Sequence, residues 1–105
     1  MYRNAMIDHI GIRVSNVERS VEFYTKVLAP LGYELIMRWE QHAGFGVGGK
    51  PDFWLDGSGA PKEHQHVAFR AGGRQQVRDF FAAALAAGGT DNGPPGPRAH
   101  YHEHY

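Results

Sequence analysis

A short pattern occurs twice in this chain, and each copy is followed by a matching set of apolar positions. The segment 8–14 (DHIGIRV) reappears as 65–71 (QHVAFRA), with His-x-x-x-Arg at the same place in both copies. Tandem duplication is the simplest explanation, and it predicts that both halves fold into the same arrangement of elements. The same offset also aligns four later pairs without a gap: Phe23 with Phe80, Tyr24 with Phe81, Leu28 with Leu85 and Gly32 with Gly89.

The repeated pattern alternates as a half-buried strand does. In the first copy Ile10, Ile12 and Val14 share one face, while His9 and Arg13 share the other. The second copy places His66 and Arg70 in the same way. Two related strands can therefore aim two imidazoles and two guanidinium groups into a common space.

The first copy predicts a β-α-β-β-β module over about residues 6–62. A strand over 6–14 is followed by Ser15-x-x-Glu18, a capping box that predicts a helix start. Apolar residues then follow at helical spacing until Pro30 and Gly32 end the helix; they are Val17, Val21, Tyr24, Leu28 and Leu31. Three further strands are predicted at 33–39, 43–47 and 53–56, with 48–51 as a turn.

The second copy predicts a shorter module over about residues 63–105. Its strand is expected at 64–71, and apolar positions between Val77 and Leu85 predict a helix that Gly88-Gly89 ends. A turn-forming segment follows, and 100–105 is a candidate last strand with His100, His102 and His104 on one face. The sequence therefore predicts a single α+β domain over 1–105, made of two tandem βαβββ modules of which the second is incomplete.

Composition excludes several classes of function. Lys plus Arg and Asp plus Glu are 11 each, so the chain has no net charge and no basic stripe, which argues against nucleic acid as a partner. Without cysteine there is no disulfide, thiolate metal site or thiol nucleophile. Neither a signal peptide nor a membrane span is indicated, so we expect a cytoplasmic protein.

The sequence of the predicted strand and helix over 8–28 resembles the N-terminal segment of proteins of the vicinal oxygen chelate superfamily. This superfamily includes glyoxalase I, bleomycin-resistance proteins and extradiol dioxygenases. The segments His66-Val67-Ala68-Phe69, Ala86-Ala87-Gly88-Gly89 and His100-Tyr101-His102 resemble later parts of glyoxalase-like members. This resemblance implies two paired modules whose curved mixed sheets enclose a cavity. It also implies a small-molecule substrate with adjacent oxygen atoms, and a metal-dependent lyase, isomerase or dioxygenase as the activity.

The resemblance assigns metal ligands as well. His9 and His66 match the two histidine positions, and Asp56 is the acid available on the fourth strand, where Trp54 stands at the expected ligand position. Imidazole and carboxylate groups suit a divalent ion such as Zn²⁺, Ni²⁺, Fe²⁺ or Mn²⁺, which would hold both substrate oxygens. The family's last strand, with its glutamate ligand, would lie beyond Tyr105, so a partner chain in a homodimer is a candidate source of the missing strands.

A metal-free alternative uses the same face. Arg13 and Arg70 are candidates to hold an anionic group, and Tyr101 to supply a phenol. Phe53 and Trp54 are candidates for an aromatic wall, although at least one of the two is expected to lie in the core. The chain would then bind a small molecule as bleomycin-resistance proteins do, or be an inactive shortened relative. The histidines near the C-terminus are interpreted as an exposed segment that binds metals only adventitiously.

Overall fold

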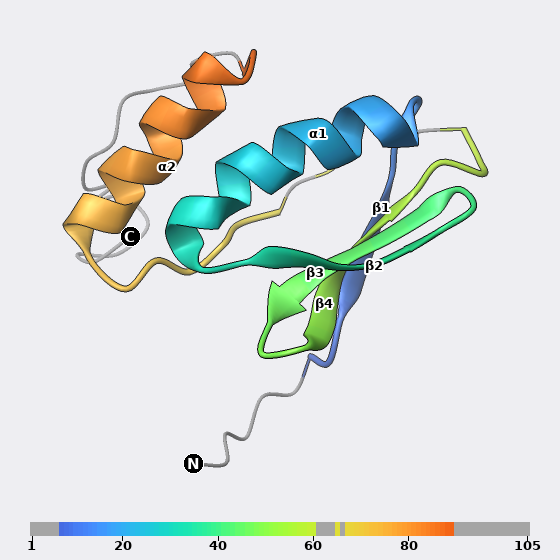
Figure 1. The fold of residues 1–105 in the computed structure, drawn as a ribbon, viewed down its shortest axis with the longest axis horizontal. Coiled ribbons are helices and arrows are strands. Elements are labelled where there is room, and N and C mark those ends of the chain that lie inside the picture. Colours follow the sequence, from blue (N-terminus) through green and yellow to red (C-terminus); the bar gives the residue numbers. More distant parts are fainter. Residues whose placement is uncertain (1–6, 61–64, 66, 90–105) are drawn as a thin grey trace.

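The computed structural model describes residues 7–60, 65 and 67–89. These form one open four-stranded sheet with both α-helices on the same side (Figure 1). The elements in chain order are β1 (Ile10–Arg13), α1 (Val17–Leu28), the short 3₁₀ helix η1 (Ala29–Leu31), β2 (Glu34–Trp39), β3 (His42–Val47), β4 (Lys50–Asp56) and α2 (Arg74–Ala86). The α+β class and the β-α-β-β-β order of the first module are confirmed.

The start of α1 lies one residue later than the capping box predicts. Asn16 has extended backbone angles, and its side-chain oxygen accepts a hydrogen bond from the Arg19 amide at 3.1 Å. Asn caps helices at least as well as Ser, so the predicted role of Ser15 was wrong by one position. At the other end, Gly32 adopts φ +83°, a left-handed conformation that suits glycine, and its amide bonds to the Ala29 carbonyl.

The sheet has the order β1-β4-β3-β2, with β1 and β4 parallel and the other pairs antiparallel. Gly48 and Gly49, both at positive φ, form the turn between β3 and β4. The predicted turn over 48–51 was therefore too long, because Lys50 and Pro51 belong to β4. The register shifts at two places: Ile36 is the extra residue in β2 opposite β3, and Asp52 is the extra residue in β4, opposite Phe45 and Gly46 of β3. These irregularities decide which side chains share a face.

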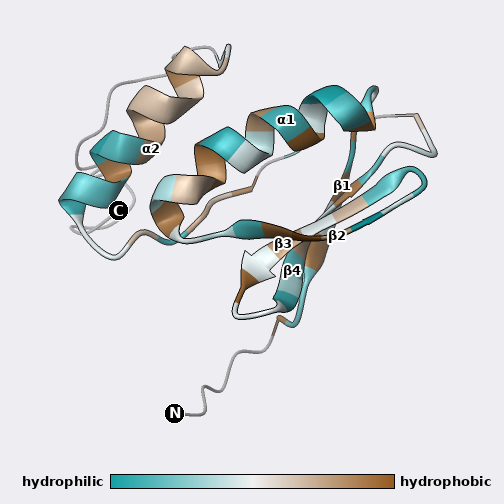
Figure 2. Cartoon of the chain, in the orientation of Figure 1, coloured by the Kyte–Doolittle hydropathy of each residue, from teal (hydrophilic) through white to brown (hydrophobic). Residues whose placement is uncertain are grey.

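The core lies between α1 and the sheet. Phe45, Phe53, Leu55 and Leu28 are fully buried there, and the apolar positions predicted for the helix all pack in or against this cluster. Figure 2 shows the polar residues of α1 on the side away from the sheet. Phe53 therefore belongs to the core, as predicted for at least one of the adjacent aromatic residues at 53 and 54.

The second copy contributes a helix and a packed segment, and no strand among its described residues. Val67 and Phe69 pack against the core, with the Phe69 ring 4.9 Å from that of Phe53, but residues 65 and 67–71 do not join the sheet. The strand predicted over 64–71 was wrong for these residues. At the outer edge of β1, the Gln65 side-chain amide bonds to both the backbone N–H and the carbonyl of Arg13, each at 3.0 Å, where a strand would have placed backbone groups.

Candidate functional site

In the described part of the chain, one face of the sheet carries no helix, and several of the predicted site residues lie on it. Ile12, Leu55 and Ala43 point to the core on the other face, so their strand neighbours point away from the helices. We call this helix-free surface the open face. It comprises Gly11 and Arg13 of β1, Trp54 and Asp56 of β4, His42 and Gly44 of β3, and Met37 and Trp39 of β2.

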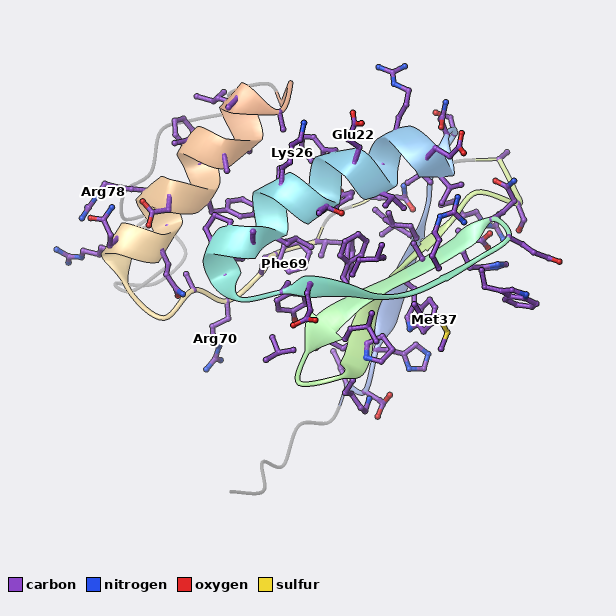
Figure 3. The ribbon with its side chains drawn as sticks, viewed as in Figure 1. Glu22, Lys26, Met37, Phe69, Arg70 and Arg78 are labelled. Atoms are coloured by element: carbon purple, nitrogen blue, oxygen red, sulfur yellow. The ribbon has the colours of Figure 1, made fainter. Side chains whose placement is uncertain are left out.

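The strand register arranges the open face in two rows. Gly11, Trp54, Gly44 and Met37 are paired across the four strands and form the apolar row. The ring of Trp54 lies so close to Gly44 that a Cβ atom there would come within 2.9 Å of it. Met37 continues the row and is 49 % exposed; Figure 3 shows it pointing away from α1.

The second row is polar and aromatic. Arg13, Asp56, His42 and Trp39 are paired across the strands in the same way. The His42 ring stacks on Trp39 with a centroid distance of 5.7 Å and an interplanar angle of 23°, and Trp39 itself is 62 % exposed. The imidazole is thus held between an indole on one side and a carboxylate on the other.

Asp56 is the electrostatic centre of this row. Its Oδ1 accepts hydrogen bonds from the Ser58 amide at 2.8 Å and the Ser58 hydroxyl at 2.6 Å, and lies 3.5 Å from His42 Nε2. The Ser58 hydroxyl is the largest of the causes that lower the pKa of Asp56, and the positive charge of Arg13 acts in the same direction. The His42 Nδ1 atom is buried and has no hydrogen-bond partner among the described residues.

His9 lies directly before β1, and its side chain contacts Asp8. Its Nδ1 is 3.0 Å from Asp8 Oδ1, to which the Lys50 ammonium also donates at 3.0 Å. These two contacts lower the pKa of Asp8, that with His9 the more strongly. The His9 side chain is 61 % exposed, so nothing in the described part of the chain confines its other nitrogen.

The described residues do not bring the predicted metal ligands together. Asp56 pairs with Arg13 at the far end of β1 from His9, and the four residues of β1 alone span about 10 Å. Two ligands of one ion lie within about 4.5 Å of each other, because each donor atom sits about 2 Å from the metal. Since His9 leans towards Asp8 and Asp56 towards Ser58, these two side chains do not fit one ion in this arrangement.

The remaining predicted site residues lie elsewhere. Arg70 is exposed on the segment before α2, and Figure 3 shows it pointing away from both helices. His66, Tyr101 and the cluster of His100, His102 and His104 lie outside the described residues. Within the described ranges, no three His, Asp or Glu side chains group together in a metal-binding arrangement.

A surface cavity of about 500 Å³ lies on the opposite side of the molecule, between α1 and the end of α2. Its lining includes Asn16, Arg19, Phe23, Lys26 and Gly88, and most of its surface is polar. None of the predicted site residues that the structure describes lines it. It is therefore a second possible binding surface, which a test of function has to distinguish from the open face.

Sequence reasoning missed His42, Met37 and Trp39. His42 falls one residue before the strand predicted at 43–47, and beginning that strand at 42 would have placed it beside Asp56. For Met37 and Trp39, simple strand alternation predicts the wrong face. Leu35 faces the core, so residues two and four positions later would be expected to face the core as well. The bulge between Leu35 and Met37 reverses the alternation, and no residue in the segment indicates it.

Comparison with known proteins gives the family. The model of the Glyoxalase/Bleomycin resistance protein/Dioxygenase superfamily matches residues 6–103. The chain belongs to this superfamily. A crystal structure of a glyoxalase/bleomycin resistance protein from Albidiferax ferrireducens T118 is similar with a TM-score of 0.77 and 27% sequence identity, over 90% of this chain and 82% of that one. The search of curated proteins gave no match.

The match to the superfamily model confirms the family that the sequence resemblance over the predicted strand and helix indicated. It agrees with the open sheet and the two helices on its other side. In the part of the chain that the structure describes, no helix is long and apolar enough to cross a membrane.

Proposed function

We propose that this chain binds a small molecule on the open face of its sheet. The observation that carries the proposal is the apolar row, in which Trp54 lies across Gly44 beside Met37, next to the charged side chain of Arg13. Partly exposed aromatic surface beside a few polar groups is typical of ligand sites. The superfamily name, which includes bleomycin-resistance proteins, supports a binding role.

The metal-dependent lyase, isomerase or dioxygenase activity remains a prediction from the family resemblance. A divalent ion would supply charge stabilisation for an anion formed from vicinal oxygens. His9 and Asp56 lean apart, and His66 lies outside the described residues, so we derive no catalytic step from them. The expected homodimer and cytoplasmic location likewise remain predictions.

The proposal is tested by locating bound ligands on the ¹⁵N-labelled chain by NMR. A collection of small aromatic and polar compounds is titrated while the indole N–H of Trp54 and the amides of Gly11 and Gly44 report on the open face. The amides of Phe23 and Gly88 report on the cavity between the helices. We expect compounds to shift the first group; shifts confined to Phe23 and Gly88 would overturn the assignment of the site.

Metal dependence needs a separate measurement. Elemental analysis of protein purified without an affinity tag is compared among the wild type, His9→Ala and Asp56→Asn. On the metal-free proposal we expect no stoichiometric ion that depends on both residues. One ion per chain, lost in each variant, would instead show that His9 and Asp56 move together on binding and would favour the metal-dependent alternative.

A further inference from the structure

Within the open face, the two rows together define a chemical class of ligand. We propose that the site takes a flat aromatic anion, with its ring on the apolar row and its negative group at Arg13. This inference rests on the proposed function, since it names the substrate class of the same face. Two observations support it: the flat apolar surface around Trp54, and the guanidinium of Arg13 beside that surface.

The apolar row is shaped for a flat group. Gly11 and Gly44, on either side of Trp54, have no side chains that would rise above the strands. The indole reaches across Gly44 towards Met37, so a low apolar surface runs over three strands. An aromatic ring gains more from such a surface than a bulky aliphatic group, because ring faces and thioethers stack favourably on indole.

The polar row beside the apolar row holds one cation, Arg13, and one carboxylate, Asp56, which face each other across β1 and β4. The carboxylate of Asp56 is already engaged by two donors from Ser58 and faces His42. Arg13 forms no ion pair with the acidic side chains that the structure describes, and its guanidinium lies beside Gly59, where an added Cβ would be 3.6 Å from Nε. A guanidinium with free donors binds a carboxylate or phenolate with charge-assisted hydrogen bonds.

The spacing of the two parts suits a ligand of two fused rings. Trp54 pairs with Gly11, and Arg13 follows two residues later on the same face of β1. Two residues of strand cover about 7 Å. A ring that lies over Gly11, beside Trp54, can therefore carry its anionic group towards Arg13.

Three probes separate the contribution of the aromatic ring from that of the negative charge. They are naphthalene-2-carboxylate, the neutral 2-naphthamide and the non-aromatic cyclohexanecarboxylate. Affinities come from NMR titrations that follow the Trp54 indole N–H, which Trp39→Phe distinguishes from that of Trp39. In the wild type we expect the naphthoate to bind about tenfold or more tightly than either other compound. Equal affinities for naphthoate and naphthamide, or for naphthoate and cyclohexanecarboxylate, would overturn the proposal.

Variants assign the preference to the named side chains. Arg13→Gln is expected to remove the preference for naphthoate over naphthamide, whereas Arg78→Gln, an exposed arginine on α2, is expected to keep it. Trp54→Leu, in which the backbone amides of Gly11 and Gly44 replace the indole as reporters, should weaken both naphthyl compounds. A preference that survives Arg13→Gln contradicts the inference, and if no probe or library compound shifts the Trp54 indole, the proposed function itself fails.

Discussion

Trp54 has a glycine on each side, and the two glycines differ in how close the indole comes. A Cβ at Gly44 would lie 2.9 Å from two atoms of the ring, which is closer than ordinary contacts allow. A Cβ at Gly11 would lie 3.7 Å from the Trp54 Cβ, an ordinary van der Waals distance. Only Gly44 therefore has to be glycine for the indole to rest where it does.

We predict that Gly44→Ala displaces the Trp54 ring and lowers the free energy of unfolding by about 1–3 kcal/mol, as overpacking does. Gly11→Ala is the matched control, and its effect should be within about 0.5 kcal/mol of zero. Urea unfolding followed by circular dichroism measures both. Equal effects of the two substitutions would mean that the indole does not rest on Gly44 in solution.

Tyr33 and Asp52 form a half-buried pair near the start of β4. The Tyr33 hydroxyl donates to Asp52 Oδ2 at 3.1 Å, while Asp52 Oδ1 is buried without a partner among the described residues. Burial, and then the hydrogen bond to Asp52, raises the pKa of Tyr33 to about 12 from the usual 10.0. The folded protein thus holds this proton more tightly than the unfolded chain does.

The raised pKa of Tyr33 makes the stability of the fold fall in alkaline solution. Between pH 10 and 12 the unfolded chain loses the Tyr33 proton first, so stability that is complete below pH 10 falls as the pH rises. We predict that Tyr33→Phe is less stable than the wild type at pH 8 by about 1 kcal/mol, since Asp52 loses a donor. Its urea midpoint should also fall less between pH 9 and pH 11, and an equal fall in both proteins would contradict the role of Tyr33.

The site residues show what strand alternation can and cannot predict. Arg13, Trp54 and Asp56 share a face because β1 and β4 are regular between positions 10–13 and 53–56, so alternation was a sufficient guide. The family resemblance predicted His9 and Asp56 as ligands of one ion, and the sequence alone does not give the strand register that separates them. The parallel pairing of Arg13 with Asp56, and the hydrogen bonds that turn each side chain away from the other, appear only in the folded chain.

At the scale of elements, the first module was predictable because each boundary has a local cause. An apolar face at helical spacing predicted α1, and the left-handed Gly32 closes the helical segment. The helix start was misplaced because Ser15 and Asn16 are both good caps, and only the backbone shows that Asn16 is the one used. The bulge in β2 has no comparable local signal, so the face of Met37 and Trp39 was not predictable.

The segment before α2 shows the limit of the repeat as a guide. Its alternation is preserved, with Val67 and Phe69 packed inwards and Arg70 exposed, as in the first copy. A strand, however, is defined by its backbone partners. The Gln65 side chain makes hydrogen bonds to the Arg13 backbone at the edge of β1, and the described residues of this segment pack on the core without joining the sheet.

For the described molecule as a whole, the two copies of the repeat place their helices in unequal environments. Leu28 on α1 and Leu85 on α2 occupy the same repeat position, yet Leu28 is 0 % exposed and Leu85 is 43 % exposed. The reason is that α1 lies on the sheet, whereas α2 packs beside α1 and η1 and has no fully buried residue (Figure 1). Val77, two helical turns earlier on α2, is exposed as well.

This inequality predicts different costs for the same substitution. Leu28→Ala should lower the free energy of unfolding by about 2–5 kcal/mol, because it leaves a cavity under α1. Leu85→Ala should cost under about 1 kcal/mol, because much of the side chain already faces water and alanine favours the helix. Urea unfolding of both variants at two protein concentrations tests this. Similar costs that grow with concentration would show that a second copy covers α2 in solution, and the repeat would then have two buried helices after all.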